Sequence, residues 1–262
     1  MAALIGQPTP EAGEAPATAN LIRQAAYQVI GIGAVLVATA ICLHLFDRRK
    51  LRTIGYQLHR GWWTDYLLGA AISATMLCTV VVVGLVTEAL QLQAQGDEKA
   101  AWLTAAFLAL LFFNVAAVTE ELMFRGYPLQ TLLLDCHPVM AIAVPAVIFG
   151  LVHLPNPNSS ALSTANTILA GLWLGVAYFK TRSLWLCTGL HWAWNFAMGP
   201  VFGLSISGLD PMLKHTLLRS RASGPVWLMG GDYGPEGGII VTAVLTVTTW
   251  ALFRSRIILR RV

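Results

Sequence analysis

Two carboxylates and a guanidinium lie close together in an otherwise apolar stretch of the sequence. Glu120, Glu121 and Arg125 fall inside a mostly hydrophobic run from about residue 101 to residue 134. A charged group at bilayer depth costs at least about 2.5–3.5 kcal/mol on insertion scales, so it usually has a partner or a function. These three side chains are therefore the first candidates for a functional site.

Helical geometry is expected to separate the two acids. Residues four apart share a helix face, so Glu121 and Arg125 are predicted to form an ion pair. Glu120 points roughly 100° away from Glu121 and is left for other chemistry, such as that of a general base. The alternative is that both acids only balance Arg125 and join helices, with no catalytic role.

Two later apolar runs each contain a polar pair four residues apart. Phe149 and His153 end one run, and His191 and Asn195 lie in another. A single histidine in a membrane helix often serves only to hydrogen-bond a neighbouring helix. Two histidines, an amide and a carboxylate from three segments are instead the groups needed to activate water and to stabilise an oxyanion.

Taken in order, these motifs resemble those of the CAAX protease and bacteriocin-processing (CPBP) family, which includes the type II CAAX prenyl endopeptidases. The resemblance covers roughly residues 100–205 and implies an intramembrane endopeptidase, a hydrolase of peptide bonds. Its substrate would be a peptide or protein, cleaved near a C-terminus that can carry a prenyl group, or within a leader or membrane peptide. The motifs are Glu120-Glu121-x-x-x-Arg125, Phe149-x-x-x-His153 and His191-x-x-x-Asn195.

The resemblance also implies a role for each residue of the motifs. Glu120 and His153 would activate a water molecule, and His191 and Asn195 would stabilise the oxyanion formed from the peptide carbonyl. The supporting residues would be Glu121, Arg125 and Phe149. The glycine-rich run 230–238 also resembles a segment that follows the core in some bacterial members of the family.

A metal requirement stays open at this point. Two histidines and a glutamate can bind zinc, and the ligands would then be His153, His191 and Glu120. The H-E-x-x-H spacing of many zinc proteases does not occur in the sequence. A hydrolase that uses glutamate without a metal, and therefore without a cofactor, is the favoured interpretation.

Composition predicts the setting of this site. The chain has 262 residues, of which 56% are hydrophobic and only 11% are charged, whereas a soluble domain carries about 25% charged residues. This indicates an all-α, multi-pass bundle of transmembrane helices. The net charge of +4 comes from basic residues between and after the apolar runs, a pattern that favours membrane lipids rather than nucleic acid as partners.

Seven apolar runs are predicted to span the membrane. The domain boundaries expected from them are a flexible tail at 1–20, N-terminal helices at 21–98, a protease core at 99–205, and an extended loop, last helix and basic tail at 206–262. The long connector 203–237 is expected to fold as a cap over one face. The predicted spans are residues 25–46, 66–90, 101–134, 139–154, 162–179, 184–202 and 238–253.

The depths of the motif residues raise a difficulty for a simple zigzag of helices. Glu120 falls in the middle of the long third run, whereas His153 ends the fourth. For both to reach one water molecule, either the third helix must break near Thr119 or the fourth segment must start deep in the membrane.

Basic residues predict the orientation of the bundle. The connector 47–65, the turn 180–182 and the tail 254–261 hold most of them and fall on one side if seven spans alternate. The positive-inside rule then places the C-terminus in the cytoplasm and the N-terminus outside, in the cell membrane of what the compact length suggests is a bacterium. Two other functions remain open: a catalytically silent regulator or scaffold for cell-envelope enzymes or bacteriocin immunity, and a proton-coupled transporter.

Overall fold

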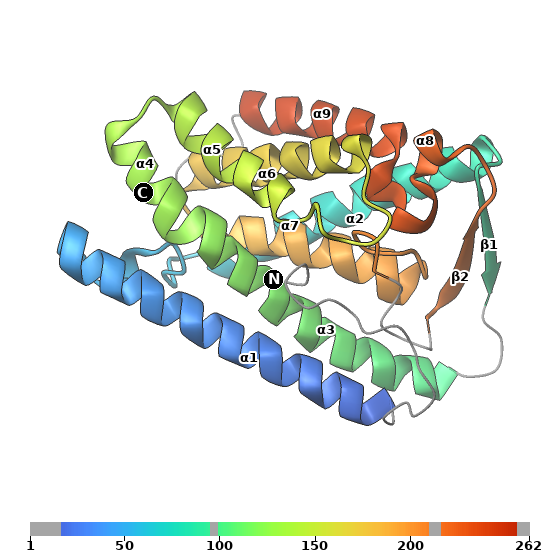
Figure 1. Cartoon of the computed structure of the whole chain (residues 1–262), viewed down its shortest axis with the longest axis horizontal. Helices are drawn as coiled ribbons and strands as arrows, with labels where there is room; N and C mark the ends of the chain where they lie inside the picture. The colour runs from blue at the N-terminus through green and yellow to red at the C-terminus, as the bar shows by residue number, and fades with distance from the viewer. Residues whose placement is uncertain (1–16, 95–98, 210–215, 256–262) are drawn as a thin grey trace.

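The computed structural model describes residues 17–94, 99–209 and 216–255. It is a bundle of helices with a small two-stranded sheet at one end (Figure 1). The predicted flexible tail at 1–20 lies outside the described residues, except for its last four. Those four residues are helical, since α1 already begins at Ala17.

The helical segments correspond to the predicted apolar runs. The third run is a single helical path made of α3, a π-helical segment and α4, while the connectors hold short 3-10 turns and α8. The main elements are α1 (Ala17–Cys42), α2 (Trp62–Val86), β1 (Leu90–Ala94), α3 (Lys99–Glu121), the π-helical segment Leu122–Gly126, α4 (Tyr127–Asp135), α5 (Pro138–Leu151), α6 (Ala161–Thr181), α7 (Leu184–Phe196), β2 (Leu218–Ala222), α8 (Val226–Met229) and α9 (Ile239–Arg254).

Fewer helices reach the length of a membrane span than the sequence predicted. Within the described residues, four are long and apolar enough: Ala26–Asp47, Trp62–Val86, Trp102–Asp135 and Ala161–Thr181. Two others, α5 and α9, are apolar but shorter, and α7 has only 13 residues before it changes to π-helical winding. The structure therefore establishes a helical protein with membrane-spanning character, and a count of seven spans stays a prediction.

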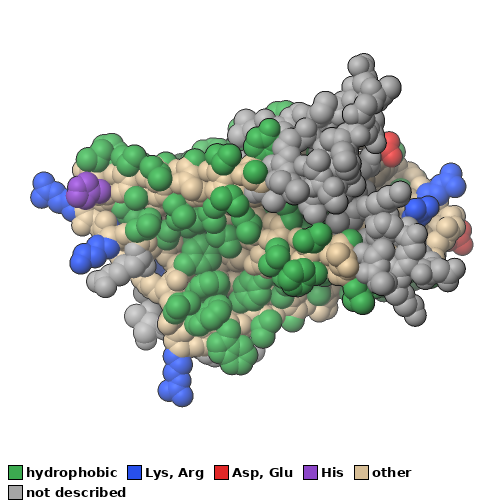
Figure 2. All heavy atoms as spheres, turned by 90° about the horizontal axis from the view of Figure 1, so that it is seen from below, with side chains coloured by type: hydrophobic (Ala, Val, Ile, Leu, Met, Phe, Trp, Pro, Cys, Tyr) green, Lys and Arg blue, Asp and Glu red, His purple; other side chains and the backbone are tan. Residues whose placement is uncertain are grey.

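The outer surface has the character expected in a bilayer. Figure 2 views the molecule from below and shows hydrophobic side chains over the middle of this face, with basic side chains at its ends. Exposed apolar residues are numerous on the two long helices of this side, including Ile30 and Val37 of α1 and Phe107 of α3. Such a surface is suited to lipid, because a soluble protein rarely exposes so large an apolar area.

The small sheet is a difference from the predicted all-α fold. β1 and β2 pair antiparallel, with Leu90 opposite Ala222 and Ala94 opposite Leu218. The predicted second span included Leu90, but its alternation with Gln91 and Leu92 is the period-2 pattern of a strand. The sheet ties the connector before α3 to the long connector after α7, and the latter also contains α8 and two 3-10 turns.

The long third helix does not break at Thr119. It continues as α-helix to Glu121 and changes to π-helical winding only from Leu122 to Gly126, before α4 begins. The fourth segment is short instead: α5 ends at Leu151, and His153 lies in the turn after it. π-Helical turns of this kind are frequent at functional sites.

Close helix packing at glycines brings the site-bearing helices together. A Cβ atom on Gly189 of α7 would overlap the carbonyl oxygen of Tyr66 in α2, and one on Gly69 would overlap the carbonyl oxygen of Leu186. Small residues of this kind let the backbones of membrane helices approach closely. This contact fixes the position of α7, the helix that carries His191.

We expect Gly189→Ala to destabilise the protein by about 1–3 kcal/mol, because a methyl group there forces α2 and α7 apart. Gly33→Ala is the matched control, since a Cβ atom added to Gly33 of α1 would meet no atom of the described chain within 4 Å. Thermal unfolding of both variants in one detergent measures the difference. Equal melting temperatures for Gly189→Ala and the wild type would contradict the close contact.

Candidate active site

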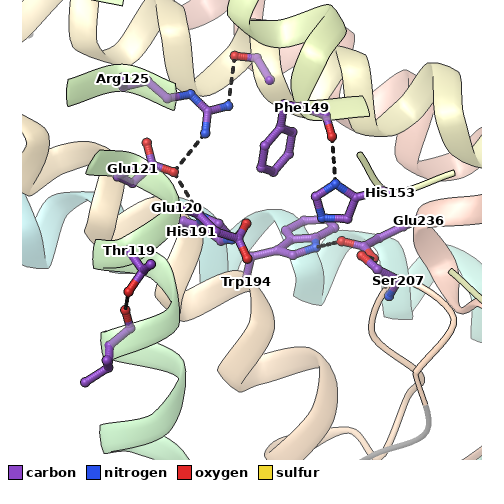
Figure 3. A network of polar contacts seen from close by, with 12 residues as sticks. Thr119, Glu120, Glu121, Arg125, Phe149, His153, His191, Trp194, Ser207 and Glu236 are labelled. Carbon is purple, nitrogen blue, oxygen red and sulfur yellow. Dashed lines mark hydrogen bonds and ion pairs between the residues drawn. The ribbon is translucent and has the colours of Figure 1, made fainter. Parts of the chain in front are cut away.

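The carboxylate of Glu121 binds two other side chains of the polar cluster inside the bundle (Figure 3). Its Oε1 atom accepts a hydrogen bond from Nη1 of Arg125 at 3.1 Å and one from Nδ1 of His191 at 2.8 Å. Glu121 is completely buried and Arg125 is 1% exposed. The predicted ion pair of Glu121 with Arg125 is therefore present, and it has a further member that was not predicted, His191.

Arg125 connects this carboxylate to two more helices. Its Nη2 atom donates to the carbonyl oxygen of Gly171 in α6 at 3.3 Å. Its guanidinium carbon lies 4.5 Å from the centroid of the Phe149 ring in α5, within the range of a cation–π interaction. Gly171 itself packs against α5, where a Cβ atom would lie 2.8 Å from Cα of Ala146. One buried cation thus joins α5 and α6 to the helix that carries both acids.

His191 lies between the two glutamates. Its Nδ1 atom contacts Glu121, and its Nε2 atom lies 3.7 Å from Oε2 of Glu120. A carboxylate oxygen only accepts hydrogen bonds, so the Nδ1 atom must carry a proton. In the neutral ring with its proton on Nδ1, the lone pair is on Nε2, the nitrogen on the side of Glu120. Both Glu120 and His191 are largely buried.

His153 is oriented by the backbone of its own segment. Its Nδ1 atom lies 2.7 Å from the carbonyl oxygen of Phe149, and a carbonyl can only accept, so this nitrogen is also protonated. The neutral ring then has its lone pair on Nε2, as an acceptor. The Phe149 ring lies 4.7 Å from the His153 ring and meets the His191 ring edge-on at 6.2 Å. Phe149 therefore stands as a spacer between the two imidazoles.

Asn195 is placed one helical turn after His191 on α7, as predicted. It is partly exposed, and within the described part of the chain its side chain forms no hydrogen bond. The α-helix ends one residue later, at Phe196. The Asn195 amide can therefore donate a hydrogen bond to, or accept one from, a ligand on this face of the helix.

Several polar residues of the cluster were not predicted from the sequence. The indole Nε1 of Trp194 donates to Oε1 of Glu236 at 2.9 Å, and Ser207 binds the other oxygen of the same carboxylate (Figure 3). Glu236 belongs to the glycine-rich run 230–238, which the motif analysis noted without giving any residue in it a role. The one feature of the sequence that could have indicated Glu236 is the presence of an acidic residue in a glycine-rich connector.

The sequence named His153, His191 and Glu120 as the ligands in case the protein binds zinc. Among the residues that the structure describes, no group of three or more His, Cys, Asp or Glu side chains has the geometry to hold a metal ion. The Nδ1 atoms of His191 and His153 are held by Glu121 and by the Phe149 carbonyl, so Nε2 is the nitrogen of each ring left for water or another ligand. The chemistry considered below uses these side chains and water.

The two glutamates are expected to differ in their effect on stability. Glu121→Gln leaves Arg125 buried without its counter-charge and replaces the charged acceptor of His191 by a neutral one, a loss that typically amounts to about 3–5 kcal/mol. Glu120→Gln keeps the shape of a side chain outside the Glu121–Arg125 pair and serves as the control. Yield and thermal unfolding of the purified variants measure the difference. A Glu121→Gln protein as stable as Glu120→Gln would contradict the central role of this carboxylate.

The comparison with known proteins agrees with the motifs. Residues 100–197 match the family described as Type II CAAX prenyl endopeptidase Rce1-like. No curated protein and no solved structure matches the chain. The matched interval holds all the predicted site residues: Glu120, Glu121, Arg125, Phe149, His153, His191 and Asn195. This confirms the resemblance: residues 100–197 are similar to the type II CAAX prenyl endopeptidase Rce1-like family.

Proposed function

We propose that this chain is an intramembrane endopeptidase of the CAAX type that cleaves peptide bonds with water activated by glutamate and histidine. The family match supports a CAAX protease in general. The observation that carries the specific proposal is the position of His191, held at 2.8 Å by Glu121 and facing Glu120 with its other nitrogen. A structural ion pair between Glu121 and Arg125 needs neither the second acid nor the histidines.

Glu120 and His153 are assigned to the activation of water. A water molecule between the Glu120 carboxylate and the Nε2 lone pair of His153 donates a hydrogen bond to each acceptor, which raises the electron density on its oxygen. As this oxygen attacks the peptide carbonyl carbon, its proton moves to Glu120. The same proton then passes to the leaving amine when the C–N bond breaks.

His191 and Asn195 are assigned to the oxyanion. In its charged form His191 has a proton on Nε2 to donate, while its Nδ1–H stays hydrogen-bonded to the Glu121 carboxylate, which stabilises the imidazolium. The amide of Asn195 supplies a second donor from the same face of α7. Donors that are fixed before the reaction stabilise developing negative charge without reorganisation. Glu121 thus orients the histidine and balances its charge.

The proposed substrate is a peptide or protein held at the membrane, either a prenylated C-terminal segment or a leader or membrane peptide. The apolar surface and the four long helices support a location in the membrane. We also propose the orientation predicted from the basic residues, with the C-terminal tail in the cytoplasm. The orientation is tested by labelling an engineered cysteine near Arg52 in intact cells.

Glu120→Gln is expected to abolish cleavage while the protein remains folded, because the amide keeps the size of the side chain but cannot accept the proton. General bases contribute about 10²–10⁴-fold to rate. The assay uses the purified full chain in nanodiscs with a fluorogenic prenylated peptide and a library of leader peptides. Normal cleavage by Glu120→Gln would remove Glu120 from the mechanism.

Asn195→Ala is expected to lower kcat by about 10²–10³-fold and to leave KM nearly unchanged, because an oxyanion donor acts mainly in the transition state. Asn195→Asp should be at least as harmful at neutral pH, since it places a negative charge beside the oxyanion. Steady-state kinetics with the best peptide from the library separate kcat from KM. A raised KM with normal kcat would instead assign Asn195 to substrate positioning.

A further inference from the structure

The carboxylate of Glu236 accepts three hydrogen bonds from two distant parts of the chain. Nε1 of Trp194 in α7 donates to its Oε1 at 2.9 Å. The backbone N–H and the hydroxyl of Ser207 both donate to its Oε2, each at 2.7 Å. Figure 3 shows this carboxylate between the Trp194 indole and Ser207, on the His153 side of the cluster. Two of these three groups are N–H donors that cannot accept, one on each side of the carboxylate, so both of its oxygens must accept.

Ser207 lies at the tip of a very short hairpin. Ile206 and Leu209 exchange two backbone hydrogen bonds of 2.9 Å, and the two residues between them have positive φ angles, 50° for Ser207 and 81° for Gly208. This is the pattern of a type I′ turn. A left-handed conformation costs a residue other than glycine about 1–2 kcal/mol. The hydrogen bonds to Glu236 hold Ser207 in it.

The same hairpin tip is bound from its other side by the segment that carries His153. Nδ2 of Asn156 donates to the carbonyl oxygen of Ser207 at 2.8 Å. Asn156 lies in the turn directly after His153, and its backbone N–H donates to the His153 carbonyl oxygen at 3.1 Å. Asn156 therefore connects the hairpin tip to the turn that begins at His153.

Trp194 provides the connection to the other histidine. It follows His191 by three residues on α7, so the two side chains lie on adjacent positions of one helix face. The path Asn156–Ser207–Glu236–Trp194 thus runs from the turn of His153 to the helix of His191 and Asn195. On the opposite side the two imidazoles are separated by the Phe149 ring. The Phe149 ring and the path through Glu236 together hold the two imidazoles apart at a defined distance, whereas either contact alone would let one histidine rotate relative to the other.

We propose that Glu236 is a positioning residue that holds His153 and the His191–Asn195 pair at their working separation. This inference rests on the proposed function, since the separation matters when one group activates water and the other binds the oxyanion. Small misplacements of such groups lower rates strongly, by up to about 100-fold for 1 Å. Glu236 touches no reacting atom in this scheme and acts through Trp194 and Ser207.

Glu236→Gln tests the proposal, because an amide has only one accepting atom and must point its NH₂ group at a donor on one side of the bridge. Asp232→Asn is the matched control: Asp232 is an exposed acid of the same glycine-rich run, and its side chain has no hydrogen bond within the described part of the chain. In the peptidase assay, Glu236→Gln should lower kcat by about 10- to 100-fold, with KM changed less than about 3-fold. Asp232→Asn should match the wild type.

Trp194→Phe is the second variant, and it keeps an aromatic ring while it removes only the N–H donor. Its loss in kcat should be similar in direction to that of Glu236→Gln. The double variant should lose no more than the larger single effect, because both changes break the same bridge. This variant also keeps the test decisive if Glu236→Gln does not fold.

A measurement that does not depend on activity separates this inference from the proposed function. The imidazole ¹⁵N resonances of His153 and His191, identified by their disappearance in His153→Gln and His191→Gln proteins, are recorded with ¹⁵N-histidine labelling. Both should shift in Glu236→Gln and Trp194→Phe, and neither should shift in Asp232→Asn.

The outcomes are distinct. Shifted resonances together with a lower kcat support the positioning role. If the resonances shift in both variants but the wild-type protein cleaves no peptide, the bridge between the histidines is supported and the proposed peptidase function is overturned. Unmoved resonances, or a Glu236→Gln protein that only melts at a lower temperature and has normal kcat, overturn the positioning role.

Discussion

A buried carboxylate with two cationic or proton-donating partners is the interaction on which the rest of this structure depends. One oxygen of Glu121 binds both Arg125 and His191, and removing Arg125 would leave an uncompensated charge in an apolar interior. Arg125 reaches on to the Gly171 carbonyl and the Phe149 ring. The contacts of Glu121, Arg125 and His191 therefore hold α3, α5, α6 and α7 in their relative positions.

Packing and electrostatics depend on each other in this bundle. The cluster can form only if helix backbones approach closely, which the contacts at Gly171 with Ala146 and at Gly189 with Tyr66 allow. The approach is in turn maintained because a shift of α7 would pull His191 away from Glu121. Membrane helices gain no hydrophobic free energy by leaving lipid for one another, so contacts of these two kinds must supply their association.

Local patterns in the sequence predicted what local geometry determines. The Glu121–Arg125 pair follows from a spacing of four within one helix, and the apolar runs predicted helices. The bond of Glu121 to His191, 70 residues away, and the Trp194–Glu236 bond, 42 residues apart, depend on how distant segments pack. No spacing rule reaches that far. Helix length was also overestimated, because apolar composition continues past Leu151 into a turn and cannot mark the last hydrogen-bonded residue.

The shortness of α5 has a consequence for the surrounding lipid. Its 14 residues extend roughly 21 Å at about 1.5 Å per residue, well below the hydrocarbon thickness of roughly 30 Å. Val144, Val147 and Ile148 are exposed on its outer side, an apolar surface suited to contact with acyl chains. A bilayer adapts to such hydrophobic mismatch by thinning. In the membrane location proposed above, such thinning would bring the headgroup layer and its hydration water toward the turn that holds His153, where the proposed hydrolysis would consume water.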